Sequence, residues 1–339
     1  MDYKAEITKI HYDKDAKGII FNILKVASVF YGFGSQLKNI LYDTGIKKPK
    51  KADTFVISVG NLTTGGVGKT PVVAEIANYC ISKGEKVAII SRGYGGKLSN
   101  KNINLISDGE KIFYDASQAG DEPYWLSQNT KAIVITSKNR YKAAIYAKEN
   151  FNVDKIILDD GFQHRKLHRD LDIVLIDSEK QFGNECQLPA GPLRENINSI
   201  KRADKLVVVS KNVYHDDAER FARGLERKYE LPVSVCKVEP EYVYNIKSNF
   251  HLQKGLKTIA MCAIGQPEQF FNFLDGYAVD EKIVYDDHHK YKREDIPNTN
   301  LPIITTEKDA VKVKDFDFEN IYALKLKTIL DVETLLKQN

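Results

Sequence analysis

Residues 60–71 form a glycine-rich segment with the sequence Gly60-Asn61-Leu62-Thr63-Thr64-Gly65-Gly66-Val67-Gly68-Lys69-Thr70-Pro71. An apolar run at residues 54–59 precedes it and predicts a buried strand, and a helical pattern follows it from Pro71 to about Lys83. Glycines between a strand and a helix let backbone N–H groups converge on phosphate oxygens, and the positive end of the helix adds to the attraction. The stretch therefore predicts a phosphate-binding loop, or P-loop.

The side chains of this loop suit a nucleotide and its metal ion. Lys69 can reach the β- and γ-phosphates, and the hydroxyl of Thr70 can ligate Mg²⁺. The common P-loop pattern begins with Gly five residues before Gly68, where this chain has Thr63. A purely structural glycine-rich turn is the alternative, but the strand before the loop and the helix after it favour nucleotide binding. The expected nucleotide-binding residues of the loop are Thr63, Thr64, Gly65, Gly66, Val67, Gly68, Lys69 and Thr70.

A pair of carboxylates supports this interpretation. The apolar run at residues 156–158 ends in Asp159 and Asp160. Carboxylates at the carboxyl end of a strand beside a P-loop are where Mg²⁺ and its water are held. An Asp pair at a strand end is by itself often just a turn, but its combination with the P-loop favours a nucleotide site. We therefore expect Thr70, Asp159 and Asp160 to contact the metal ion or its water.

Two arginines follow predicted strands on the side of the sheet where the P-loop lies. Arg92 follows the strand predicted at residues 86–91, and Arg140 follows the strand predicted at residues 132–136. Guanidinium groups match phosphate oxygens, so both can clamp a transferring phosphoryl group. We expect Arg92 to bind the nucleotide and Arg140 to act in catalysis. The alternative is an exposed arginine at the start of a helix, and it applies most to Arg140.

The predicted fold class is α/β, a P-loop NTPase-like three-layer α/β/α domain with a second, smaller α/β domain. Continuous β-branched runs that alternate with helical patterns indicate a parallel sheet covered on both faces. In the first domain these runs lie at residues 54–59, 86–91, 132–136, 155–158 and 172–176. A second set of strands is predicted at residues 206–209, 233–235, 258–261 and 303–305. We place the P-loop domain at residues 46–178 and the second domain at residues 179–317.

Composition excludes several other classes of protein. The chain has 339 residues, 42% hydrophobic and 28% charged, which is typical of a folded soluble protein of two domains. A net charge of +4 gives no support for a nucleic-acid partner. The four cysteines are widely spaced and form no CxxC pair, so reduced thiols in a cytosolic protein are favoured over disulfides or zinc. We also find no secretory signal and no clear transmembrane span.

The most apolar segment, residues 19–41, is interrupted every three or four residues by Asn22, Lys25, Ser28, Gly32, Gln36 and Asn39. On a helix these positions form one narrow polar stripe, and the rest of the surface is apolar. Such a helix either packs into a core or lies in a membrane interface. A basic cluster at residues 47–51 follows it and suits an anionic membrane surface, although it is equally typical of a solvated charge run. From this segment alone the two alternatives are about even.

An ordered set of motifs resembles the tetraacyldisaccharide 4'-kinase family. Besides the P-loop, the matching motifs are Ser91-Arg92-Gly93-Tyr94-Gly95, Gly120-Asp121-Glu122-Pro123, Leu158-Asp159-Asp160-Gly161-Phe162-Gln163-His164, Leu188-Pro189-Ala190-Gly191-Pro192-Leu193-Arg194-Glu195, Asp287-His288 and Thr306-Glu307-Lys308-Asp309-Ala310-Val311-Lys312. They extend in order from residue 55 to about residue 312. In this family Thr stands at the first P-loop position, so the departure at Thr63 strengthens the resemblance.

The resemblance implies a function, a location and a set of partners. The family transfers the γ-phosphate of ATP, with Mg²⁺, to the 4'-hydroxyl of a tetraacyldisaccharide 1-phosphate, a lipid A precursor. It works as a peripheral enzyme at the cytoplasmic face of the inner membrane of Gram-negative bacteria. Residues 1–45 are then the expected membrane-interface region, and a final segment, about residues 318–339, is expected to return to the P-loop domain. No obligate protein partner is implied.

The resemblance also assigns roles to residues. It implies that Asp121 is the general base that takes the proton of the sugar hydroxyl, and that His288 orients or tunes that base. The alternatives are that Asp121 is a helix N-cap, and that His288 is a surface histidine. Glu122 is a further candidate for contact with the metal ion or its water.

Two other classes compete with a small-molecule kinase. A P-loop switch or partitioning ATPase, which is a binding module, carries a similar glycine-rich loop. That class has a signature lysine where this chain has Thr64, which argues against it. A GTPase is disfavoured because the chain shows no clear Asn-Lys-x-Asp guanine motif.

Overall fold

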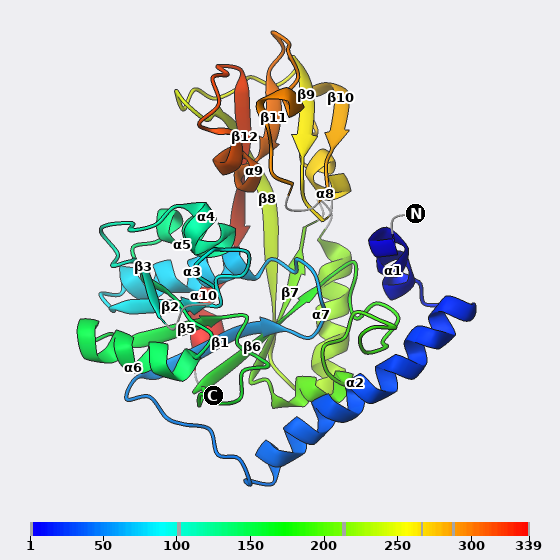
Figure 1. Cartoon of the computed structure of the whole chain (residues 1–339), viewed down its shortest axis with the longest axis vertical. Helices are drawn as coiled ribbons and strands as arrows, with labels where there is room; N and C mark the ends of the chain where they lie inside the picture. The colour runs from blue at the N-terminus through cyan, green and yellow to red at the C-terminus, as the bar shows by residue number, and fades with distance from the viewer. Residues whose placement is uncertain (1–2, 100–102, 212–214, 266, 287–288, 338–339) are drawn as a thin grey trace. The chain divides into compact units, whose positions relative to one another are not determined.

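The computed structural model describes residues 3–99, 103–211, 215–265, 267–286 and 289–337. The chain divides into two compact units (Figure 1). Unit 1 comprises Met1–Ser210, Asp216–Cys236 and Leu330–Asn339. Unit 2 comprises Lys211–His215 and Lys237–Ile329.

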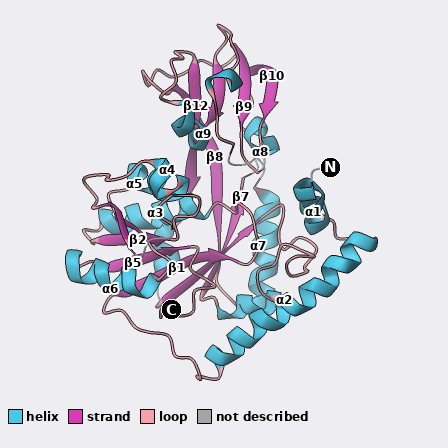
Figure 2. Ribbon diagram, in the orientation of Figure 1, coloured by secondary structure: helices cyan, strands magenta, loops and turns pink. Residues whose placement is uncertain are grey.

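Unit 1 is a mixed α/β unit, as predicted, and Figure 2 shows its strands flanked by helices. Its strands are β1 (Phe55–Asn61), β2 (Val87–Ser91), β3 (Asn104–Ser107), β4 (Ile133–Thr136), β5 (Lys155–Asp159), β6 (Leu171–Asp177), β7 (Lys205–Ser210) and the beginning of β8 (Val233–Asn245). Its helices are α1 (Tyr3–Tyr12), α2 (Ile19–Asp43), α3 (Lys69–Ser82), α4 (Ala116–Ala119), α5 (Asp121–Asn129), α6 (Arg140–Phe151), the 3-10 helix η1 (Ile197–Arg202), α7 (Asp216–Tyr229) and α10 (Val332–Leu336).

The sheet of unit 1 runs in the order β7-β6-β1-β5-β2-β4-β3. All these neighbours pair in parallel except β3 and β4, which are antiparallel. Val56, Ile90 and Leu158 share one core with α6, so the alternate residues of these strands face the other side of the sheet. There α3 packs on β1, β2 and β5. The predicted parallel sheet with helices on both faces is therefore confirmed for the centre of unit 1.

The register of this sheet brings the predicted site residues to one edge. Val59 of β1 lies opposite Asp159 of β5, so the P-loop and Asp160 leave the sheet side by side. Strands β2 and β4 end at the same edge, where Ser91 pairs with Thr136. Gly60 permits this arrangement, because an added Cβ there would lie 2.6 Å from the Cβ of Phe162.

Unit 2 has its own small core. Its strands are the rest of β8, β9 (Lys257–Cys262), β10 (Ala278–Val284), β11 (Ile303–Thr306) and β12 (Ile321–Ile329), and its helices are α8 (Pro267–Asn272), the 3-10 helix η2 (Arg293–Asp295) and α9 (Glu307–Val313). The strand order is β10-β9-β11-β12-β8, parallel except for the antiparallel pair β12 and β8. Its buried cluster includes Ile259, Met261, Ile303 and Ile321.

The structure differs from the sequence prediction at the unit boundary. The prediction separated the domains at residues 178 and 179 and returned the chain near residue 318, whereas β6 pairs with β7 and the chain returns at Leu330. Strand β7 and helix α7 also pack on the core of unit 1, through Leu206 and Ala222 among others. The prediction missed α1, β3, β10 and β12. Strand β10 is largely exposed, so it lacks the continuous apolar run on which the prediction relied.

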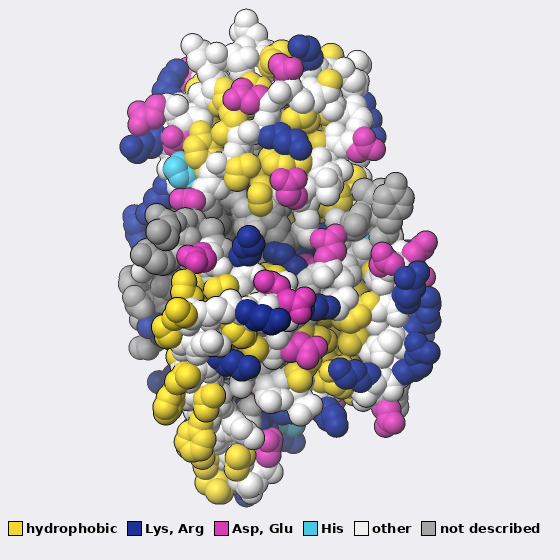
Figure 3. Space-filling view, turned by 90° about the vertical axis from the view of Figure 1, so that its right-hand side faces the viewer, with side chains coloured by type: hydrophobic (Ala, Val, Ile, Leu, Met, Phe, Trp, Pro, Cys, Tyr) yellow, Lys and Arg dark blue, Asp and Glu magenta, His cyan; other side chains and the backbone are white. Residues whose placement is uncertain are grey.

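Helix α2 presents its apolar side chains to solvent. Only Gly32 is buried among its 25 residues, while Ile23, Val26 and Phe33 are 63%, 63% and 70% exposed. Of the predicted polar stripe, Ser28 and Asn39 are half-buried, whereas Asn22, Lys25 and Gln36 are exposed. Figure 3 faces the side of unit 1 on which α1 and α2 lie and shows hydrophobic side chains gathered in a column on its lower part. Even so, within the described ranges no helix has the length and apolar character needed to cross a bilayer.

Candidate active site

The P-loop connects β1 to α3 as predicted, and α3 begins at Lys69 rather than at Pro71. Gly65 has φ +104° and Gly68 has φ +95°, conformations that favour glycine and explain why the loop needs it at these positions. The ammonium group of Lys69 donates to Asn61 Oδ1 at 3.1 Å and lies 3.5 Å from Asp160 Oδ1. The lysine expected to meet phosphates is thus held at the carboxyl edge of the sheet.

Asp160 is paired with two cations. Besides Lys69, Arg194 Nη1 donates to both carboxylate oxygens of Asp160 at 2.8 Å. Burial raises the pKa of Asp160, but the charges of Lys69 and Arg194 outweigh it and hold the pKa below its usual value. The carboxylate therefore stays ionised and fixes both cations. The sequence predicts no role for Arg194, because its partner lies 34 residues away and only the fold brings the two residues together.

Asp159 has a different environment from its neighbour. It is 2% exposed, and its Oδ1 has no hydrogen-bond partner among the described residues. Burial, then the nearby charge of Glu122, raises its pKa to about 7, although Lys69 and Arg140 oppose the shift. A buried carboxylate oxygen without a partner is unfavourable unless a cation or donor completes it.

Arg140 is the first residue of α6 and is only 4% exposed, so the alternative of an exposed arginine is wrong. Its Nη1 donates to the Ser137 carbonyl, and its Nε has no hydrogen-bond partner among the described residues. Burial lowers its pKa, while the charges of Asp159 and Asp160 raise it. A buried guanidinium with an unused N–H can receive an anion at this edge.

Helix α5 begins at Asp121, and its N-cap is Gly120. The N-cap alternative for Asp121 is therefore wrong, because Asp121 occupies the first helical position. Gly120 packs closely on the loop after β2, since an added Cβ would lie 2.7 Å from the Tyr94 carbonyl oxygen. Both Glu122 and Arg92 are exposed. Their charges act on Asp159 and Arg140 respectively, which places both near the edge.

His288 lies outside the described residues, so its predicted role stays a prediction. The next residue, His289, belongs to unit 2 and is described. Its Nε2 lies 3.0 Å from Asp295 Oδ2, and its ring stacks on Tyr285 with centroids 4.7 Å apart. These contacts fix His289 within unit 2.

A cavity of about 760 Å³ opens beside this edge of unit 1. It is lined by Phe30, Tyr31, Gly34, Ser35, Lys38, Asn39, Arg92, Lys138, Arg140, Asp160, Gln163, His164, Arg194 and Glu195. One wall belongs to α2 and the other to the loops that follow β2, β4, β5 and β6. The cations in this lining outnumber the two carboxylates, so the cavity suits an anionic group.

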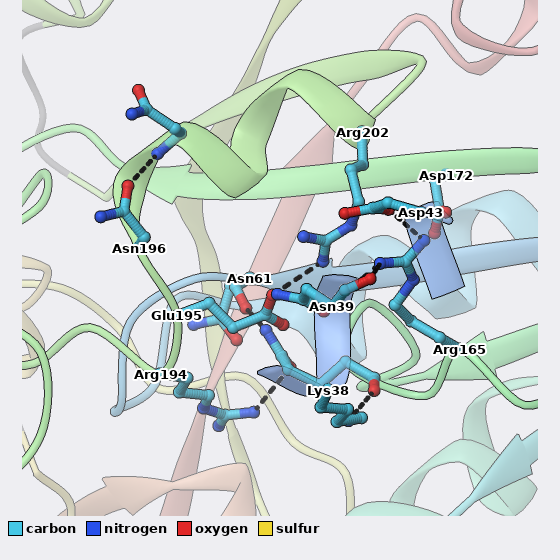
Figure 4. A network of polar contacts seen from close by, with 12 residues as sticks. Lys38, Asn39, Asp43, Asn61, Arg165, Asp172, Arg194, Glu195, Asn196 and Arg202 are labelled. Carbon is cyan, nitrogen blue, oxygen red and sulfur yellow. Dashed lines mark hydrogen bonds and ion pairs between the residues drawn. The ribbon is translucent and has the colours of Figure 1, made fainter. Parts of the chain in front are cut away.

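Polar contacts attach α2 to the loops of the cavity (Figure 4). The Tyr31 hydroxyl donates to the Arg194 carbonyl at 3.0 Å, and Lys38 Nζ donates to the Gln163 carbonyl at 2.8 Å. Asn39 Nδ2 donates to Glu195 Oε2 at 2.7 Å. Burial lowers the pKa of Lys38. This wall of the site could not be predicted from the sequence, because only the fold brings α2 against these loops.

Glu195 and His164 show how the cavity lining is charged. Arg202 Nη2 donates to Glu195 Oε2 at 2.9 Å, so this carboxylate binds both Arg202 and α2. His164 has no hydrogen-bond partner for Nε2 among the described residues. Burial, and then the charge of Arg140, lower the pKa of His164 to about 4. The imidazole is therefore neutral at neutral pH and leaves the positive charge of the cavity to lysine and arginine.

The residues at this edge of the sheet suit a Mg²⁺ ion whose remaining ligands are phosphate oxygens and water. Across the described residues, no group of three or more His, Cys, Asp or Glu side chains is placed to hold a metal ion. Mg²⁺ usually needs only one or two carboxylates together with phosphate oxygens and water. The partnerless Oδ1 of Asp159 is one such ligand. Asp160, another predicted ligand, is instead paired with Lys69 and Arg194.

The chain is similar to known proteins over most of its length. Residues 20–338 match the family model described as Tetraacyldisaccharide-1-P 4'-kinase. A tetraacyldisaccharide 4'-kinase of Halothermothrix orenii is 36% identical, covering 92% of this chain and 90% of that protein. One of Desulfotalea psychrophila is 38% identical, covering 94% and 95%. A crystal structure of LpxK from Aquifex aeolicus in complex with ATP is 33% identical with a TM-score of 0.77, covering 94% of this chain and 97% of that one.

Proposed function

The chain belongs to the tetraacyldisaccharide 4'-kinase family, and we propose how its own residues carry out the reaction of that family. The chain is an ATP-dependent kinase of the lipid A pathway, which transfers the γ-phosphate of ATP to the 4'-hydroxyl of a tetraacyldisaccharide 1-phosphate. A switch or partitioning ATPase is not favoured. The observation that carries the proposal is the convergence of Lys69, Asp159 and Arg140 at the edge of a cationic cavity.

We assign phosphate binding and transfer to this edge. The P-loop holds the phosphates of ATP through its backbone N–H groups, and Lys69 neutralises the β- and γ-phosphates. Arg140, which is buried and whose Nε–H has no partner among the described residues, stabilises the charge that develops on the transferring group, and exposed Arg92 adds a second cation. When a triphosphate arrives, Lys69 exchanges its contacts with Asn61 and Asp160 for phosphate oxygens.

Asp121 is the proposed general base. Asp121 is the first residue of α5 and directly precedes Glu122, and the charge of Glu122 acts on Asp159 at the edge, which supports a position of Asp121 near the site. A carboxylate positioned at a sugar hydroxyl removes the proton as the oxygen attacks the γ-phosphorus, and the bond to the ADP oxygen breaks in the same displacement. For His288 the family role, tuning of this base, stays a prediction.

Asp159 and Thr70 are the residues that we assign to Mg²⁺, with exposed Glu122 able to bind a water of the ion. Bound with ATP, the ion neutralises phosphate charge during transfer. Asp160 is better suited to hold Lys69 and Arg194 in place than to act as a ligand.

The cavity and α2 suit an amphiphilic acceptor at a membrane surface. Lys38, Lys138 and Arg194 line the cavity and can bind an anionic sugar phosphate, while Phe30 on the rim is 75% exposed and continues the apolar face of α2. Acyl chains that remain in a membrane would contact this face, and the basic cluster at residues 47–51 would lie near anionic headgroups. We therefore propose peripheral association with the cytoplasmic face of the inner membrane.

The decisive experiment is the transfer of labelled γ-phosphate from ATP to a tetraacyldisaccharide 1-phosphate acceptor. We expect labelled lipid with the wild-type chain and a loss of about 10³-fold with Lys69→Ala, because the transition state loses a phosphate cation. Lys83→Ala, at the other end of α3, is the matched control and should keep full activity. ATP hydrolysis without labelled lipid would contradict the assigned reaction.

The same assay tests the general base. Asp121→Ala should lower kcat by about 10²–10⁴-fold with little change in ATP affinity, because general-base catalysis contributes in that range. Glu149→Ala on the exposed surface of α6 serves as the control. Turnover near the wild-type rate in folded Asp121→Ala protein would remove this residue from the mechanism.

A further inference from the structure

The loop at residues 183–192 binds the end of α1. The Asn184 N–H donates to the His11 carbonyl at 2.9 Å, and the Asn184 side-chain amide donates to the Ile10 carbonyl at 3.0 Å. His11 is only 9% exposed, and its Nε2 lies 3.0 Å from the Pro189 carbonyl oxygen. The close approach requires a glycine, because a Cβ on Gly183 would collide with the His11 carbonyl. Helix α1 is therefore docked at its last turn.

The same loop continues to the P-loop. The Pro192 carbonyl accepts a hydrogen bond from the Thr64 N–H at 2.8 Å, and the Arg194 N–H donates to the Leu62 carbonyl at 2.7 Å. Tyr12, the last residue of α1, completes the arrangement, because its hydroxyl donates to the Thr64 carbonyl at 3.2 Å. Thr64 is thus held at its N–H by one segment and at its carbonyl by another.

The contact from Tyr12 fixes the direction of the next backbone N–H. In a trans peptide the C=O and N–H groups point to opposite sides. With the Thr64 carbonyl directed at Tyr12, the Gly65 N–H points away from α1. Gly65 is exposed and has no side chain that could fix its backbone, and its carbonyl accepts a hydrogen bond from the Val67 N–H at 3.2 Å. On the other side of Gly65, the contacts of Thr64 restrict the orientation of the Thr64–Gly65 peptide.

We propose that Tyr12 is a positioning residue for ATP, which orients the Thr64–Gly65 peptide of the P-loop from outside through its hydroxyl. The inference rests on the proposed function, since it concerns the nucleotide of that reaction. It also gives a role in nucleotide binding to α1, a segment that precedes the part matched by the family model, residues 20–338.

The surroundings of Tyr12 keep its hydroxyl a donor. Burial, and then the charge of Asp177, raise the pKa of the phenol, so the proton stays on the oxygen through the neutral range. Lys180 lies over the ring, with Nζ 4.8 Å from its centroid, and so holds the ring in place. A Phe ring keeps these ring contacts and loses only the hydroxyl.

Calorimetric titration of the full-length chain with a non-hydrolysable ATP analogue tests the proposal. Tyr12→Phe should weaken binding by about fivefold, which corresponds to one ordinary hydrogen bond. In the kinase assay the KM for ATP should rise by a similar factor, while kcat and the KM for the lipid acceptor stay unchanged. Tyr79→Phe is the matched control, because Tyr79 is also half-buried under a lysine but lies near the far end of α3.

Hydrogen exchange separates positioning from folding. In the ATP-free protein, Tyr12→Phe should accelerate exchange in peptides that cover residues 62–68 and leave the melting temperature unchanged. Equal ATP-analogue affinity in wild-type and Tyr12→Phe protein overturns the inference, and so does a weakened affinity that accompanies a general loss of stability. A wild-type chain that does not bind the analogue contradicts the proposed function itself.

Discussion

Helices α2 and α3 both border the candidate site, but unit 1 holds them in opposite ways. Helix α3 buries six of its 14 residues, including Val73, Ile76 and Ala77, against the sheet. Helix α2 buries one of 25. The first helix is fixed by apolar packing, whereas the second is attached through Tyr31, Lys38 and Asn39 and directs its apolar residues outward.

Amphipathicity alone therefore does not determine which face of a helix contacts the protein. The usual surface helix packs its apolar stripe on the core. Here the inward side joins Ser28, Gly32 and Asn39 to the half-buried Phe21, Leu24 and Tyr42, whereas Asn22, Lys25 and Gln36 of the predicted polar stripe are exposed. Gly32 approaches Gln187 so closely that a Cβ would lie 2.5 Å from its Oε1. A helix that leaves Ile23, Val26 and Phe33 exposed can bury them against a second apolar surface, which supports the proposed contact with a membrane.

The largest expected effect on folding tests the packing of α3. Ile76 is fully buried, so Ile76→Ala should lower the free energy of unfolding by about 2–5 kcal/mol through lost burial and a residual cavity. Trp125, the single tryptophan, lies in α5 of unit 1 and provides the fluorescence signal for denaturant unfolding. Ile23→Ala in α2, a site 63% exposed, should change stability by less than about 0.5 kcal/mol. Equal losses in the two variants would break the comparison.

The next effect concerns the outward face of α2. Replacing Val26 and Phe33 together by Asp should weaken sedimentation with anionic vesicles by about tenfold or more, because two apolar side chains no longer enter the interface. The folded chain should keep its affinity for an ATP analogue. The paired control replaces Leu256 and Val284 in unit 2, which are 46% and 51% exposed, by Asp. Unchanged vesicle binding of the α2 variant would place the membrane anchor elsewhere.

A smaller effect is expected for the hydrogen bonds that attach α2 to the loops of the cavity. Asn39→Leu removes the hydrogen bond to Glu195 and should cost about 1 kcal/mol in the local stability of α2, measured as faster amide exchange in that helix. Exchange in α3 should not change. Asn22→Leu, at an exposed position of the same helix, is the control. If α2 in Asn39→Leu exchanges at the wild-type rate, then polar contacts do not hold it.

The centre of unit 1 could be predicted from the sequence, because the parts of its phosphate-binding site lie close together along the chain. The apolar run, the glycine-rich loop and Lys69 are contiguous, and the register of parallel strands places Asp159 beside them. The position of Arg140 after β4 was also enough to bring it to the edge. These predictions depend on local pattern and on a general rule of parallel sheets.

The remaining parts of the site depend on contacts between distant segments. Arg194 binds Asp160, and Asn39 binds Glu195, which lies 156 residues away in the sequence. Hydrophobic periodicity carries no information about such pairs. The motif that contains Arg194 was recognised, but nothing in its residues told that it pairs with Asp160. Tyr12 gave no signal at all, because a single tyrosine at the end of a short polar helix is unremarkable in sequence. For α2, the pattern of residues 19–41 alone did not distinguish packing into a core from contact with a membrane. Only the structure shows which side of this helix faces the protein.

The pairing of Lys69 with Asn61 and Asp160 has a consequence for ligand selectivity. An ammonium group that already has carboxylate and amide partners gains little from a single weak anion, because each new contact replaces an existing one. A triphosphate makes many contacts with the loop at once, and these contacts offset the loss of the contacts of Lys69 with Asn61 and Asp160. The resting site is therefore expected to ignore chloride and other simple anions at cellular concentrations, and to discriminate among solutes by the number of charges that they present together.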